Sequence, residues 1–78
     1  MPLQLKDMLT PRELDIVSKV AEGLSNADAA KDLGLSTWGM KQRLVRIMDR
    51  VGCDNRVQLA VRYVREQRSR DGGMNFLG

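Results

Sequence analysis

A chain of 78 residues can form one small domain and no more, because a chain this short buries only about 60% of its unfolded surface. Hydrophobic residues make up 42% of it, charged residues 29% and aromatic residues 4%, which favours an all-helical globular core and excludes disorder throughout. The net charge of +3 is uneven, with four Lys or Arg against six Asp or Glu in residues 1–40, and nine against three in residues 41–70. The basic half indicates a polyanionic partner, because neutralised phosphates release counterions, although a solvated charged surface would look the same.

Several functional classes are excluded by what the sequence lacks. Cys53 is the only cysteine and there is no histidine, so one chain cannot assemble a disulfide framework or a zinc site, and a reduced, cytoplasmic setting is expected. No apolar run reaches the length of a signal peptide or of a membrane span. There is no glycine-rich phosphate loop and no carboxylate pair in an apolar setting, so we expect no cofactor and no enzymatic activity.

The first predicted helix begins after an N-terminal lead-in, residues 1–8, which is too short to be assigned an element of its own. Thr10 and Glu13 form a capping box with Pro11 at the first helical position, and Leu9 is placed to act as a hydrophobic staple. A helical period of apolar residues then continues to Gly23, which offers the left-handed conformation that ends a helix. The periodic residues are Leu14, Val17, Val20, Ala21 and Leu24.

A second helix is predicted over residues 25–33, where Ser25 is the cap and Asp28 lies in the first turn. Its small residues Ala27, Ala29 and Ala30 would allow a close approach to the helix that follows.

The third predicted helix, residues 36–51, starts at a Ser36 cap and ends at Gly52. Gly34 and Leu35 join it to the second helix with the spacing of a helix-turn-helix, whose second helix enters the major groove of DNA. One face carries an apolar stripe made of Met40, Leu44, Ile47 and Val51. The other face is rich in long donors and carries Trp38, Lys41, Gln42, Val45, Arg46 and Asp49. This second face should meet water or a partner.

A fourth helix is predicted from a cap at Asp54 and Asn55 to about Gln67. Its expected apolar face consists of Val57, Leu59, Ala60, Tyr63 and Val64. The domain would thus span residues 9–67, and residues 68–78 would form a flexible C-terminal tail, because paired glycines interrupt every period there. The apolar residues of that tail are Met74, Phe76 and Leu77.

With these motifs in place, the chain resembles the LuxR-type, or GerE-like, helix-turn-helix domain of bacterial transcription factors, over about residues 9–64. Residues 9–13, Leu-Thr-Pro-Arg-Glu, look like the opening of that family, and residues 23–26, Gly-Leu-Ser-Asn, look like its central signature. Further matches at fixed offsets are Ala30, Leu33, Ser36, Lys41, Ile47, Gly52 and Arg56. Many matches at fixed offsets are more specific than one short motif.

The sequence departs from the family pattern inside the third helix. Gly39 and Met40 stand where threonine and valine usually precede the lysine, and Arg43 stands where histidine is usual. Gly39 costs roughly 0.8–1 kcal/mol of helix propensity relative to alanine. Trp38 beside it either contacts DNA or a protein partner, or folds over the preceding helix.

The resemblance implies a four-helix all-α domain that binds DNA as a homodimer, with the last helix pairing with its twin. For base reading the candidates are Lys41, Gln42, Val45 and Arg46, since lysine or arginine suits guanine, glutamine suits adenine and valine suits a thymine methyl. The DNA-backbone candidates are Thr10, Ser25, Asn26, Ser36, Trp38, Arg50 and Arg56. The dimer-interface candidates are Val57, Val61 and Val64. For each polar candidate, simple capping or solvation is the competing interpretation.

Two other functional hypotheses stay open at this stage. The chain could use the helix-turn-helix scaffold to bind another transcription regulator or RNA polymerase in place of DNA, and Trp38, Gly39 and Met40 are where such a protein would first depart from a DNA reader. It also shares its Leu-Thr-Pro-Arg-Glu opening with the promoter-reading region of sigma factors, but its later motifs favour the LuxR type.

Overall fold

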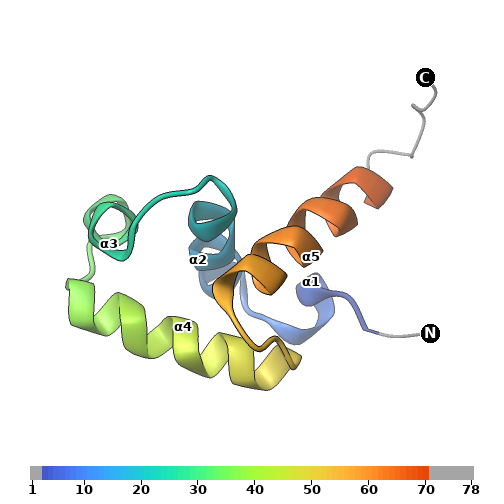
Figure 1. The fold of residues 1–78 in the computed structure, drawn as a ribbon, viewed down its shortest axis with the longest axis horizontal. Coiled ribbons are helices and arrows are strands. Elements are labelled where there is room, and N and C mark those ends of the chain that lie inside the picture. The colour runs from blue at the N-terminus through green and yellow to red at the C-terminus, as the bar shows by residue number, and fades with distance from the viewer. Residues whose placement is uncertain (1–2, 71–78) are drawn as a thin grey trace.

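The fold is entirely helical in residues 3–70, the part of the chain that the computed structural model describes (Figure 1). The four predicted helices are confirmed as α2–α5, and a short α1 precedes them. The bounds are α1 Leu5–Met8, α2 Pro11–Ala21, α3 Asn26–Leu33, α4 Thr37–Val51 and α5 Arg56–Arg70.

Side-chain caps fix the start of each of the four longer helices, as predicted. Thr10 Oγ1 accepts from the Glu13 N–H at 3.1 Å, and Glu13 Oε1 accepts from the Thr10 N–H at 2.9 Å, which completes the capping box. The remaining caps are Ser25 Oγ on the Asp28 N–H, Ser36 Oγ on the Gly39 N–H and Asn55 Oδ1 on the Gln58 N–H. Gly34 and Gly52 end α3 and α4 with φ of 71° and 74°, a conformation that favours glycine.

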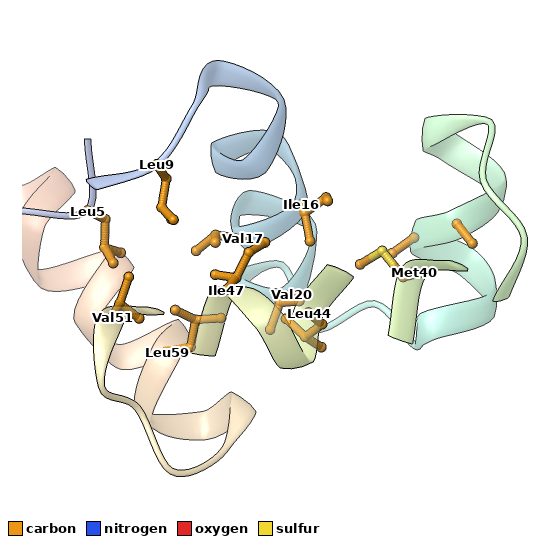
Figure 2. Packing of buried hydrophobic residues seen from close by; sticks show 12 residues of the cluster. Leu5, Leu9, Ile16, Val17, Val20, Met40, Leu44, Ile47, Val51 and Leu59 are labelled. Atoms are coloured by element: carbon orange, nitrogen blue, oxygen red, sulfur yellow. The ribbon is translucent and has the colours of Figure 1, made fainter. Parts of the chain in front are cut away.

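The helices enclose one apolar core, whose members Figure 2 shows. All four residues of the predicted α4 stripe are buried, in the same core as Val17 and Val20 of α2 and Leu59 of α5 (Figure 2). Leu9, the predicted staple, is also buried, and so is Ile16, which the predicted α2 stripe did not include.

The buried sides of α3 and α5 are narrower than the predicted sets of small and apolar residues on these helices. Ala27 is exposed, while Ala29 and Ala30 alone are buried on α3. On α5, Leu59 is fully buried, but Val57 and Val64 are exposed. At 3.6 residues per turn they lie about 200° and about 140° around the helix from Leu59, so they cannot share its face.

Residues 3–8 of the lead-in and the end of α5 contact each other, which the sequence did not indicate. Leu5 is 1% exposed, and its N–H donates to Glu66 Oε1 at 2.7 Å. Helix α5 runs to Arg70, three residues past the predicted end at Gln67. The rest of the predicted tail, with Met74, Phe76 and Leu77, lies outside the described residues.

Arg62 connects the N-terminal segment, α4 and α5. Its Nη1 donates to the Val51 carbonyl at 2.9 Å, its Nη2 to the Leu3 carbonyl at 2.7 Å, and its Nε to Glu66 Oε2 at 3.0 Å. Val51 is the last residue of α4, whose carbonyl has no partner inside its own helix. One side chain therefore ties three parts of the fold together.

Candidate nucleic-acid interface

Helices α3 and α4, with the Gly34-to-Ser36 turn between them, form the predicted helix-turn-helix. Helix α3 crosses one end of α4, and α4 runs along the outside of the molecule (Figure 1). Because the stripe beginning at Met40 is buried, the opposite face of α4 points away from the core. We refer to that exposed face as the reader face.

The structure brings the four predicted base-reading residues together on or beside the reader face. Lys41, Val45 and Arg46 are exposed, and Gln42 is half-buried. Trp38 is 71% exposed, so its ring is not folded over the preceding helix, and Val45 is 51% exposed. A helix surface with exposed apolar and long polar side chains can contact base edges in a groove or another protein.

The predicted backbone contacts include three helix caps. The oxygens of Thr10, Ser25 and Ser36 accept from the N–H groups of their own first turns. In the chain without DNA, these oxygens therefore cap helices, which was the alternative to a phosphate contact. Each hydroxyl hydrogen remains able to donate to a phosphate oxygen.

Asn26 and Arg56 are paired with each other. Arg56 Nη1 donates to Asn26 Oδ1 at 2.8 Å, and its Nη2 donates to the Leu24 carbonyl at 2.9 Å. These two bonds join the start of α5 to the first residue of α3 and to the loop before it. Arg56 thus has a structural role that the sequence did not reveal.

The three predicted dimer residues form a continuous exposed stripe on α5. Val57, Val61 and Val64 are 67%, 45% and 41% exposed, and their spacing of four and three residues places them on one side of the helix. Apolar side chains grouped in this way are typical of a surface that another protein covers.

A groove between the start of α2 and the side of α4 contains two residues that the sequence motifs did not single out as contacts, Arg12 and Arg43. Its lining residues are Thr10, Arg12, Glu13, Ile16, Arg43, Arg46 and Arg50, and together they are called the arginine groove. Glu13 is held there by Arg50, whose Nη1 lies 3.1 and 3.2 Å from the two carboxylate oxygens. A basic stripe on α4 could have been read from the spacing of Arg43, Arg46 and Arg50. Arg12 joins that stripe only because α2 packs on α4.

Within residues 3–70, no three of the His, Cys, Asp and Glu side chains are grouped in a way that would hold a metal ion. Among the same residues, no helix is both long and apolar enough to cross a membrane.

Sequence comparisons show which known proteins the chain is similar to. Residues 7–63 fit the sequence profile described as "Bacterial regulatory proteins, luxR family". The Mycobacterium tuberculosis protein Rv0890c, named as a putative HTH-type transcriptional regulator, is 45% identical over 51 residues, which are 65% of this chain and 6% of that protein. The Escherichia coli transcriptional regulatory protein UhpA is 35% identical over 57 residues, which are 73% of this chain and 29% of UhpA. The chain thus spans less than a third of either relative, and no solved structure gives a significant match.

Proposed function

Because the chain belongs to the LuxR family of bacterial regulatory proteins, we propose that it is a DNA-binding transcription regulator that reads the major groove with α4. The observation that carries this proposal is the reader face. A helix that buries one stripe in the core and exposes lysine and arginine on its other side, with a half-buried glutamine between them, can enter a groove without unfolding. The two relatives named as regulators support the same class of function.

The chemistry of the reader face supports base recognition by three residues. Lys41 can donate to the guanine O6 and N7 atoms, and Gln42 can pair with the adenine N6 and N7 atoms. Val45, which is 51% exposed, offers an apolar contact for a thymine methyl group. Arg46 stands at the border of the arginine groove.

Backbone contacts would come from the starts of the two helices of the motif. Ser25 and Ser36 begin these helices, where amide groups and the helix dipole favour phosphate. Contacts of this kind fix the register of a protein on DNA and carry no sequence information.

We further propose that the valine stripe on α5 pairs with the same stripe of a second copy. A symmetric pair would present two α4 helices to two half-sites, which lie about 34–36 Å apart in DNA bound by helix-turn-helix dimers. The exposed apolar surface of Val57, Val61 and Val64 supports this proposal, because pairing would remove that surface from water.

Replacement of Val61 by glutamate should yield monomers. The charge would be buried without a partner in the paired state, whereas in the monomer it stays in water because Val61 is 45% exposed. Sedimentation velocity should show a dimer for the wild type at tens of micromolar and a monomer for Val61→Glu, with unchanged helix content by circular dichroism. A wild type that is monomeric both with and without DNA would contradict the pairing.

The exposure of Trp38 favours one alternative function. At 71% exposed, this ring on the reader helix has the size and position of an aromatic anchor for a protein partner. In that case the chain would use its helix-turn-helix to bind another transcription regulator or RNA polymerase. Truncation of the indole would then cost about 2 kcal/mol or more of binding free energy.

A titration with duplex DNA at about 50 mM salt tests the proposed function against this alternative. We expect the intrinsic fluorescence of Trp38, the single tryptophan of the chain, to change on DNA binding, since the residue stands in the first turn of α4. Trp38→Phe, followed by the anisotropy of labelled DNA, checks binding with an independent probe. Unchanged emission together with no change in anisotropy would favour the protein-binding alternative.

A further inference from the structure

The arginine groove concentrates positive charge at one place on the surface. Four arginines and one glutamate line it, so it carries three net positive charges, as many as the whole chain. It lies between two helices that are distant in sequence, α2 and α4. Like charges brought together by folding raise the free energy of the folded state unless an anion neutralises them.

The charges in the groove are unequally compensated. Arg50 is paired with Glu13, and Glu13 also accepts from the Thr10 N–H, so both oxygens of this carboxylate are engaged. In the described part of the chain, Arg12, Arg43 and Arg46 make no hydrogen bond or ion pair. Three exposed guanidinium groups therefore line one side of α4 and the adjoining start of α2, available for an external anion.

Arg46 is the residue that connects the groove with the reader face. It lies three residues after Arg43 and four before Arg50, so the three arginines follow one strip of α4. Val45 lies at the centre of the reader face, and Arg46 is about 100° around the helix from it. An anion in the groove would thus flank the bases that Lys41, Gln42 and Val45 meet.

We propose that the arginine groove binds the sugar-phosphate strand at one rim of the major groove, with Arg12 and Arg43 as backbone-binding residues. Arg46 also binds this strand, in place of a base edge. A guanidinium group can bind two phosphate oxygens at once, in bidentate geometry. The phosphates of a DNA strand form a row, and so do the arginines of the groove. This inference rests on the proposed function, since it names further contacts of the same complex.

The test is the affinity of Arg43→Gln for two duplexes, one that the wild type retains from genomic fragments and one of random sequence. In the proposed dimer this substitution removes two phosphate-binding cations, one from each protomer. It should therefore weaken binding about sixtyfold at about 0.1 M salt, and should lower the slope of log affinity against log salt by about 1.8. Both duplexes should be affected equally, because phosphate contacts are independent of sequence. Arg12→Gln and Arg46→Gln should behave in the same way.

Two further variants sharpen the result. Lys6→Gln removes the same charge from an exposed position on α1, outside the reader face, the arginine groove and the valine stripe, and should leave both affinities unchanged. Glu13→Gln keeps the amide oxygen that accepts from Thr10, but it removes the only acid of the groove and frees Arg50, so it should strengthen binding to both duplexes.

The outcomes separate this inference from the proposed function. If the wild type binds neither duplex at about 50 mM salt, the proposed function fails and the inference fails with it. If the wild type binds and prefers the retained sequence, but Arg43→Gln and Arg12→Gln behave like Lys6→Gln, only the inference is overturned. A weakening confined to the retained sequence would assign these arginines to base edges, which also contradicts the inference.

Discussion

Raising the salt concentration from about 50 to about 200 mM should weaken binding to DNA by about 10³-fold or more. The slope of affinity against salt counts the phosphates that a protein neutralises, and a decrease of this size corresponds to about six contacts or more. The structure shows which cations can supply them.

Not every basic residue of the second half of the chain is available for DNA. Arg62 is engaged by two carbonyl groups and Glu66, and Arg56 by Asn26 and the Leu24 carbonyl. The cations near the reader face without a partner in the described part of the chain are Arg12, Lys41, Arg43 and Arg46. Lys41 is proposed to meet a base edge, so the other three per protomer give about six phosphate contacts in a dimer, at the lower end of the range of about 6–10 contacts that produces so steep a dependence.

The measurement is a series of anisotropy titrations at several salt concentrations with the wild type and Lys41→Ala. If Lys41 touches a base edge, its replacement should cost about 1–3 kcal/mol on the preferred sequence and much less on random DNA. Equal costs on both would reassign Lys41 to phosphate. A flat salt dependence would contradict the proposed DNA binding, because binding without counterion release does not fit a basic helix in a groove.

Replacement of Arg62 by methionine should lower the free energy of unfolding by about 2–3 kcal/mol, because hydrogen bonds to a charged group contribute about 1.5–3 kcal/mol each when well shielded. The Arg62 side chain is 28% exposed and that of Glu66 is 20% exposed, so solvent reduces the sum of the three bonds. Methionine keeps most of the aliphatic stem but leaves the Val51 and Leu3 carbonyls without their donor. Against a total stability of about 4–12 kcal/mol for a domain of this size, the change is large.

Arg65→Met is the matched control, because Arg65 is exposed on the same helix and has no hydrogen bond or ion pair in the described part of the chain. Its effect should stay within about 0.5 kcal/mol. Urea denaturation followed by far-ultraviolet circular dichroism measures both variants. Equal midpoints for the two would show that the Arg62 contacts add nothing to stability.

The sequence by itself determined the helices and the reader face. Caps such as Thr10 and Ser36 act on groups three residues away, and the period of the stripe from Met40 to Val51 is a property of one helix. Both signals are local, so they do not depend on which helices pack against each other. They were enough to place Lys41, Gln42 and Val45 on a face turned away from the core.

Only the tertiary structure decided how the remaining polar residues are used. Leu5 and Glu66 are 61 residues apart, and Arg50 and Glu13 are 37 apart, yet each pair is in contact. No periodic pattern encodes such contacts, because they depend on how separate helices cross. For this reason the helical lead-in, the structural roles of Arg56 and Arg62, and the meeting of Arg12 with Arg43 in one groove could not be predicted from the sequence.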